Sequence, residues 1–334
     1  MPAALSSLSP HLSKPRMSYP TSTAGETEWP ASEIVPSTTP PETARRHVLE
    51  VRGVRRSFGK VPAVDNVDLT AREGEIYGFL GINGAGKTTT IRLIMGIIAA
   101  ESGTITLLDE TTRRTSVAQK RRIGYVSQEQ NFYPWMTCKA IGKFVGAFYP
   151  TWDAAEFARL LKMFEIPEDR RTSELSGGMR AKLALALAIA PRPALLILDE
   201  PTAGLDPVAR REFMQIIVAQ AREHQRTTFF SSHLIDEVER CADRIGIIHQ
   251  GRMRFEGALD ELRGRVRRIE FPAGQDVAVP AGFEIWRDEE LMGVRRLTLN
   301  AAPSDWATWA SVEPAPLTLE EIFIACVGSR QVRI

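Results

Sequence analysis

The chain has 334 residues, a formal net charge of +1 and a hydrophobic fraction of 43%. This length leaves room for one large or two modest domains with an ample core. The nearly balanced charge excludes a global field that would attract nucleic acid or an anionic membrane, so we expect no nucleic-acid partner. No apolar run approaches the ~18 residues needed to span a bilayer, so we expect a chain that is soluble, or peripheral to a membrane at most.

The first 45 residues have the composition of a disordered tail. Of these residues, 22 are Ser, Thr or Pro, which leaves no apolar face able to fold. No charged segment followed by an apolar run opens the chain, so we expect no secretory signal. The tail could regulate or tether the protein, or it could be an inert extension or the product of a misassigned start codon.

Cys138, Cys241 and Cys326 are the three cysteines, and they lie far apart and outside any metal-ligand spacing. An odd number of isolated cysteines favours buried thiols in a reducing compartment. A redox or metal-binding role is the weaker alternative.

Ordered structure is expected to begin near His47. Residues 48–51 alternate in polarity as a strand does, and residues 61–69 predict a second strand. Phe58 lies between these strands, and its ring could stack on an adenine face or belong to the core.

Residues 81–88 match the pattern of a glycine, any four residues, and then Gly-Lys-Ser/Thr. Residues 75–80 before them predict a buried strand, and residues 89–95 after them predict a helix. Such a turn directs unpaired amides and the positive end of a helix dipole at one point, which binds phosphate. Lys87 is expected to reach the β and γ phosphates of a nucleotide, and the Thr88 hydroxyl to bind Mg²⁺. The predicted nucleotide-binding residues here are Gly81, Asn83, Gly84, Ala85, Gly86, Lys87, Thr88 and Thr89.

Two further strands are expected at residues 103–108 and 121–126. Gln128 follows the second of these at its carboxyl end. In a chain that already holds a phosphate loop, this side chain could reach Mg²⁺ or the attacking water.

Helical periodicity marks residues 139–148 and 153–164, and aromatic residues are dense around them. The rings could form a small helical core, or they could line a groove that receives an amphipathic element of a partner. Both interpretations remain open. The aromatic residues are Phe132, Tyr133, Trp135, Phe144, Phe148, Tyr149 and Trp152.

A second anion site is predicted where Ser176, Gly177 and Gly178 precede a helix over residues 180–190. Ser176 would cap this helix, and the open amides would face outward. A nucleotide bound between two copies of the chain would use both anion sites.

Residues 195–198 predict a fully apolar strand that ends in Asp199 and Glu200. Buried parallel strands have this composition, and α/β folds place chemistry at their carboxyl ends. Asp199 would hold Mg²⁺, and Glu200 would orient and polarise the water that attacks the γ phosphate. The alternative, two solvated carboxylates that cap the next turn, is disfavoured by the phosphate loop in the same chain.

Residues 227–230 predict another buried strand, which leads to His233. At a strand end this imidazole could hydrogen-bond the γ phosphate and report its presence. Helices over residues 208–223 and 234–241 and a strand over residues 244–249 complete this part of the chain.

The order of these elements resembles the nucleotide-binding domain of the ABC ATPase family over about residues 47–262. The resemblance rests on Phe58, the loop at 81–88, Gln128, the segment 175–178, Asp199, Glu200, Asp206 and His233. It implies an α/β P-loop cassette with an antiparallel β subdomain and a helical subdomain at about residues 130–180. It also implies a head-to-tail dimer that encloses two ATP molecules, with Asp206 among the nucleotide-binding residues. Met179 departs from the family, in which many members have Gln, and little loss is expected because backbone amides do the binding.

Segments 148–153 and 180–188 look similar to bacterial exporter-type ATPase subunits. The resemblance therefore implies a homodimer or heterodimer at the cytoplasmic face of the cell membrane. It further implies contact between residues 131–152 and integral membrane permease subunits. One alternative is a soluble ABC ATPase that acts as a regulatory or remodelling factor. The other is a non-catalytic, nucleotide-gated interaction module.

Residues 263–334 predict a small α+β appendage. Strands are expected at residues 269–271, 283–286 and 294–299, and a helix at residues 304–309. A last helix over residues 317–324 begins with a capping box of Thr318 and Glu321, and exporter-type subunits often pack this helix on the cassette. The basic run at 263–268 is expected to be a solvated linker rather than a lipid contact. The expected domains are thus a tail at 1–45, a cassette at 46–262 and the appendage at 263–334.

Overall fold

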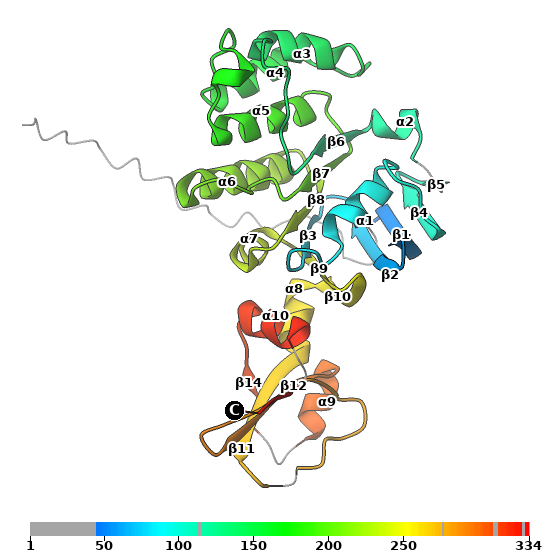
Figure 1. Ribbon diagram of the computed structural model, residues 1–334, viewed down its shortest axis with the longest axis vertical. Helices are drawn as coiled ribbons and strands as arrows, with labels where there is room; N and C mark the ends of the chain where they lie inside the picture. The colour runs from blue at the N-terminus through cyan, green and yellow to red at the C-terminus, as the bar shows by residue number, and fades with distance from the viewer. Residues whose placement is uncertain (1–44, 113–114, 276, 310–312, 329–330, 334) are drawn as a thin grey trace, which may run out of the picture. The chain divides into compact units, whose positions relative to one another are not determined.

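The computed structural model describes residues 45–112, 115–275, 277–309, 313–328 and 331–333 (Figure 1). The tail expected over residues 1–45 therefore lies outside the described residues, apart from Arg45. Within the described ranges, no helix is both long and apolar enough to cross a bilayer.

The central sheet has six strands in the order β10-β9-β3-β8-β7-β6 (Figure 1). All of them run parallel except β10, which pairs antiparallel with β9 at one edge. The strands are β3 (Ile76–Leu80), β6 (Ile123–Val126), β7 (Leu195–Asp199), β8 (Thr227–Ser232), β9 (Arg244–His249) and β10 (Arg252–Ala258). β3, β7 and β8 are buried along their whole length, as is typical of parallel strands covered on both faces. Their carboxyl ends lie next to one another, with Glu200 directly after β7 and His233 directly after β8.

An antiparallel sheet of four strands precedes and interrupts the central sheet in the sequence, with the order β2-β1-β4-β5. Its strands are β1 (His47–Phe58), β2 (Val61–Arg72), β4 (Ser102–Leu107) and β5 (Glu110–Thr112). This sheet confirms the antiparallel β subdomain that the resemblance implied.

Alternate side chains of β3 enter two different cores. Tyr77 and Phe79 pack with the antiparallel sheet and with α1 (Lys87–Ile94). Ile76 and Leu80 pack on the opposite face, which is covered by α5 (Gly177–Ile189), α6 (Pro207–Glu223) and α7 (Ile235–Cys241). The strand is therefore covered on both faces, as its unbroken apolar composition predicts.

The helical part lies between β6 and β7 in the sequence. It contains α3 (Cys138–Gly146), α4 (Ala154–Met163), the 3-10 helix η2 (Thr172–Glu174) and α5. α3 and α4 approach each other closely at Gly142, where an added Cβ would lie 2.2 Å from a ring carbon of Phe157. Gly142 is thus the residue that lets these two helices pack. Ser176 caps α5 by accepting a hydrogen bond from the Met179 amide at 3.2 Å, which confirms the predicted cap.

The C-terminal part forms a third sheet, of five strands in the order β14-β11-β13-β12-β15. Its elements are α8 (Leu259–Arg265), β11 (Val266–Pro272), β12 (Glu284–Leu291), β13 (Val294–Asn300), α9 (Pro303–Thr308), β14 (Ala315–Pro316), α10 (Leu319–Val327) and β15 (Gln331–Arg333). The predicted capping box at Thr318 and Glu321 is confirmed at the start of α10.

The expectation of a solvated linker over residues 263–268 is wrong. Arg263 and Arg265 belong to α8, and β11 begins at Val266, which is fully buried. Arg263 contacts Glu239 at 2.8 Å, and Arg268 contacts Glu321 at 2.9 Å. The basic side chains therefore lie on folded elements and form ion pairs. α2 (Val117–Lys120), a helix of four residues, was also not predicted.

α10 packs on α7, and the two helices share one apolar cluster. Ile322 of α10 is fully buried in this cluster, together with Val238 and Cys241 of α7 and with Cys326. All three cysteines are buried, as predicted. Burial raises the pKa of Cys241 to about 11 and that of Cys326 to about 12.

Substitution of two isoleucines on α10 should separate packing from local helix effects. Ile322→Ala is expected to lower the free energy of unfolding by roughly 2–5 kcal/mol, because it leaves a cavity between α10 and α7. Ile324→Ala changes the same residue type on the same helix at a position that is 43% exposed, so its effect should be much smaller. Urea unfolding of both variants measures the difference, and equal losses would contradict this packing.

Candidate functional site

A tight turn joins β3 to α1 at the position of the predicted phosphate loop. Gly86 caps α1 at φ 111°, a left-handed conformation that L side chains rarely adopt. A Cβ at Gly86 would also lie 2.6 Å from the Ala63 carbonyl oxygen, so glycine is required here. The turn leads directly into α1, whose first amides have no partner within the helix and can bind an anion.

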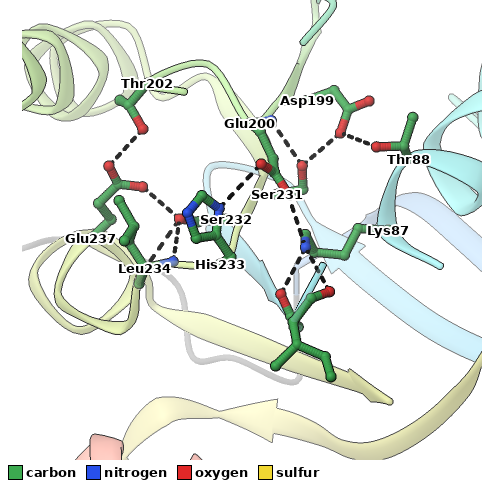
Figure 2. Close-up of polar contacts among 12 residues, drawn as sticks. Lys87, Thr88, Asp199, Glu200, Thr202, Ser231, Ser232, His233, Leu234 and Glu237 are labelled. Carbon is green, nitrogen blue, oxygen red and sulfur yellow. Dashed lines mark hydrogen bonds and ion pairs between the residues drawn. The ribbon is translucent and has the colours of Figure 1, made fainter. Parts of the chain in front are cut away.

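Lys87 is the first residue of α1 and is only 4% exposed. Its ammonium donates hydrogen bonds to the carbonyl oxygens of Gly81 at 2.7 Å and Ile82 at 3.1 Å. The same nitrogen lies 2.9 Å from Oε1 of Glu200 (Figure 2). Lys87 therefore joins the phosphate loop to the end of β7.

Asp199 ends β7 and contacts two hydroxyl groups. Its Oδ1 accepts a hydrogen bond from Ser231 Oγ at 2.8 Å and one from Thr88 Oγ1 at 3.2 Å (Figure 2). Burial raises the pKa of this carboxyl above its ordinary value, although the two hydroxyls oppose that effect. A carboxylate and a hydroxyl this close together offer oxygen ligands of the kind that Mg²⁺ takes.

Glu200 has a left-handed backbone at φ 44°, which is unusual for a residue with a long side chain. Its amide donates to Ser231 Oγ at 2.9 Å, which helps to hold this conformation. Its second carboxylate oxygen, Oε2, lies 3.1 Å from Nδ1 of His233 (Figure 2). The Glu200 carboxylate thus contacts Lys87 with one oxygen and His233 with the other.

Within the described part of the chain, no hydrogen bond or ion pair joins Gln128, Phe58 or Ser176 to this cluster. Gln128 is exposed, and its backbone oxygen accepts a hydrogen bond from Gln130 Nε2 at 3.3 Å. Phe58 is 51% exposed, with the Arg56 guanidinium 5.2 Å from its ring centroid. Ser176, Gly177 and Gly178 lie at the start of α5, as described above.

Asp206 acts as the N-cap of α6. Its carboxylate accepts hydrogen bonds from the amides of Val208 and Ala209, both at 3.0 Å. These amides, that of Ala209 first, lower the pKa of the carboxyl below its ordinary value. The side chain therefore shapes the turn between Glu200 and α6.

Four polar residues that adjoin the cluster were not predicted from the sequence. Ser231 bonds both Asp199 and Glu200, whereas Ser232 bonds Glu237, and Glu237 in turn bonds Thr202 (Figure 2). Two adjacent serines at the end of a buried apolar strand were the available signal. Glu237 had none, because a single glutamate in the first turn of a helix is ordinary.

The raised pKa of Asp199 predicts a pH-dependent stability. The pKa of Asp199 is higher in the folded state than in the unfolded state, so the folded state favours the neutral carboxyl. The stability that the neutral carboxyl contributes at low pH is therefore lost as the pH rises through the folded-state pKa. Asp199→Asn, neutral at every pH, should therefore be more stable than the parent at neutral pH without nucleotide or Mg²⁺. The stability advantage of Asp199→Asn over the parent should shrink as the pH falls toward 3.8, the ordinary aspartate pKa. Denaturant unfolding between neutral pH and pH 3.8 measures this difference.

Asp153→Asn is the matched control, with the opposite sign. The Glu156 amide and then Arg192 lower the pKa of the Asp153 carboxyl. The ionised Asp153 therefore contributes stability that is lost as the pH falls, and its replacement should destabilise the protein at neutral pH. An Asp199→Asn variant that is less stable than the parent at every pH would contradict the assignment.

Comparison with known proteins identifies the family. Residues 64–203 match a family model described as ABC transporter. The ABC transporter ATP-binding protein YtrB of Bacillus subtilis (strain 168) is 33% identical over 300 residues, which cover 85% of this chain and 99% of that protein. Nod factor export ATP-binding protein I of Paraburkholderia xenovorans (strain LB400) is 38% identical over 228 residues, which cover 64% of this chain and 72% of that protein.

A solved structure described as the ATP-binding subunit of an ABC transporter matches with a TM-score of 0.58 and 27% identity. The match covers 65% of this chain and 92% of that one. The fold and the family expected from the sequence are thereby confirmed. The chain belongs to the ABC transporter ATP-binding proteins and is an ATP-binding, ATP-hydrolysing subunit of such a transporter.

Proposed function

We propose that this chain hydrolyses Mg²⁺-ATP to drive export through separately encoded membrane subunits. The observation that supports it most directly is the contact series from Lys87 through Glu200 to His233, at the adjoining ends of three parallel strands. A relative that is named for Nod factor export supports the direction of transport.

Thr88 and Asp199 are the residues that would hold Mg²⁺. Their side-chain oxygens lie 3.2 Å apart, and a hydroxyl with a carboxylate is a donor set that fits this hard cation. Bound there, the ion would supply electrostatic stabilisation of the negative charge on the phosphates during hydrolysis. Ser231, which donates to the same Asp199 oxygen at 2.8 Å, would orient the carboxylate toward that position.

Glu200 is the residue that we assign to the attacking water. Its carboxylate is 8% exposed and is fixed at both oxygens, by Lys87 at 2.9 Å and by His233 at 3.1 Å. Exchange of the Lys87 ammonium from Glu200 to the nucleotide phosphates would free one oxygen to orient and polarise water. His233 would keep the other oxygen in place and would contact the γ phosphate.

The two anion sites would act in different copies of the chain. Ser176 and Gly177 are exposed at the N-terminus of α5, and open amides there favour a phosphate. Within the described residues, no hydrogen bond or ion pair joins them to the phosphate loop of the same chain. A head-to-tail dimer, of two copies or with a related subunit, would bring each α5 N-terminus to the other subunit's nucleotide.

We also propose roles in the nucleotide site for Phe58, Gln128 and Asp206. The Phe58 ring is half exposed, as stacking on an adenine requires. Gln128 follows β6 at the same edge of the sheet as Asp199, and would reach the Mg²⁺ or the water after a change of its side-chain conformation. Asp206 would act on the partner's nucleotide through the turn that it caps.

Glu200→Gln should separate binding from hydrolysis. The amide keeps the size of the side chain but cannot polarise water as a base, so kcat should fall by roughly 10²–10⁴. ATP binding should remain near that of the parent, and a nucleotide-bound dimer should accumulate. Phosphate release, equilibrium ATP binding and size-exclusion chromatography measure the three effects.

Glu223→Gln, an exposed position near the end of α6, is the control and should hydrolyse ATP as the parent does. Lys87→Ala should lose nucleotide binding or turnover. Parental hydrolysis in Glu200→Gln would exclude its proposed role.

An exposed aromatic surface on the helical part would contact the membrane subunits. It consists of Tyr133, Trp135, Phe144 and Phe148, which are 46%, 66%, 41% and 57% exposed. The Tyr133 ring centroid lies 5.2 Å from that of Trp135 and 5.7 Å from that of Phe144, and the centroids of Phe144 and Phe148 are 5.4 Å apart. Phe132 and Trp152 instead pack against the helical core. The aromatic-rich segment therefore contributes both to the core and to the exposed surface. The four exposed rings would receive a short amphipathic helix of the permease.

Loss of Trp135 or Phe148 should weaken the complex without affecting the isolated ATPase. Aromatic anchors at interface centres contribute about 2 kcal/mol or more, so Trp135→Ala and Phe148→Ala should recover far less membrane subunit. Affinity purification from detergent-solubilised membranes of the source, followed by mass spectrometry, measures this recovery. Met292→Ala, 95% exposed on the C-terminal part, is the control, and unchanged recovery in both aromatic variants would remove this surface from the interface.

The proposed place of the protein is therefore the cytoplasmic face of the cell membrane, bound peripherally to its permease. We also propose the division into a cassette at 46–262 and an accessory domain at 263–334. The separate third sheet, which begins at Val266, and its own small apolar cluster of Ile269, Leu297 and Leu299 support an accessory domain, although residues 262 and 263 both lie within α8.

A further inference from the structure

Glu237 is a buried carboxylate on α7 that none of the proposed catalytic steps uses. It is 5% exposed, and both of its oxygens are hydrogen-bonded. Oε1 accepts from Thr202 Oγ1 and Oε2 accepts from Ser232 Oγ, each at 2.6 Å (Figure 2). Bonds this short to a carboxylate are among the stronger hydrogen bonds in proteins.

The two partners of Glu237 belong to the two segments that carry the hydrolytic pair. Thr202 lies two residues beyond Glu200, and Ser232 lies directly before His233. Thr202 is 3% exposed and Ser232 is 2% exposed, so water does not compete for these bonds. Glu237 is thus a bridge between the end of β7 and the end of β8, placed on the side opposite the phosphate loop.

Hydrogen bonds hold the conformation of both segments, the one after Glu200 and the one around His233. Glu200 has a left-handed backbone, which persists only where the surroundings hold it. Ser232 Oγ, besides donating to Glu237, accepts the Leu234 amide at 2.9 Å, and so orders the turn that contains His233. Ser231 accepts the hydrogen bond of the Glu200 amide. Two residues later, Thr202 is held by its hydrogen bond to Glu237.

Arg210 of α6 completes the bridge. Its Nε lies 3.7 Å from Oε1 of Glu237, and its Nη2 donates to the Leu205 carbonyl at 3.2 Å. The guanidinium partly compensates the buried charge and ties the same turn to α6. The turn from Glu200 to α6 is therefore held by Glu237 and by Arg210 at two places.

We propose that Glu237 is a positioning residue for hydrolysis. It fixes Thr202 and Ser232, and through them the 3.1 Å separation between Glu200 Oε2 and His233 Nδ1. It does not touch the nucleotide. This role rests on the proposed function of Glu200, and it adds a third carboxylate to the site, one that acts on geometry alone.

The first test compares Glu237→Gln with Glu239→Gln in the full chain. Glu239 lies on the same helix but pairs with Arg263 at 2.8 Å, away from the site. Glu237→Gln should lower kcat by roughly 10- to 100-fold, the loss expected when reacting groups shift by about 1 Å, with KM for ATP unchanged. Glu239→Gln should retain the parental kcat. Equal kcat in the parent and in Glu237→Gln overturns the proposal.

The second test asks whether Glu237 acts through Glu200. In a Glu200→Gln background, Glu237→Gln should cause no further loss of residual hydrolysis, because the group that it positions is already absent. A residue that only stabilises the fold would reduce the residual rate by the same factor in both backgrounds, and that outcome also overturns the proposal.

Two smaller changes keep the test decisive if Glu237→Gln does not fold. Thr202→Val and Ser232→Ala each remove one hydroxyl from Glu237 and should each lower kcat, with less than additive effects in combination. Parental rates in both would exclude the bridge. A parent protein that hydrolyses no ATP would instead refute the proposed function itself, so the two failures remain distinct.

Discussion

The buried ion pair between Lys87 and Glu200 is the interaction on which this site depends. Removing two charges from water costs more than their attraction returns unless other hydrogen bonds satisfy them. The structure supplies these bonds from the carbonyls of the phosphate loop on one side and from His233 on the other. They come from β3, β7 and β8, which are adjacent in the sheet. The parallel strand order therefore does more than place the residues near one another, because it also keeps a buried charge pair fully bonded.

Patterns within about ten residues predicted much of this fold and site. The turn before α1, the apolar strand before Asp199 and the caps at Ser176 and Thr318 all depend on neighbours in the sequence, and each lies where expected. The bridge through Glu237 could not be predicted, because its bond to Thr202 spans 35 residues. The basic run at 263–268 was wrongly predicted to be a solvated linker for a similar reason. Its ion pairs form with residues 24 and 53 positions away in the sequence.

α7 connects two parts of the protein that the sequence separates. One side of this short helix carries Glu237 into the hydrogen-bonded network beneath Glu200 and His233. Its apolar residues Val238 and Cys241 share a cluster with α10, near the end of the chain. This contact places α10 against the helix whose Glu237 bonds Thr202 and Ser232.

The burial of all three cysteines has a practical consequence for studying motion in this subunit. Cys138 is fully buried, Cys241 is 8% exposed and Cys326 is 3% exposed, and burial raises the pKa of each thiol. A thiol that is both shielded and protonated reacts slowly with maleimides, because the nucleophile that adds to a maleimide is the thiolate. A single cysteine introduced on the surface can thus be labelled in the otherwise native chain. Spin or fluorescent probes placed on α5 and on the phosphate loop would then follow the approach of two subunits in real time.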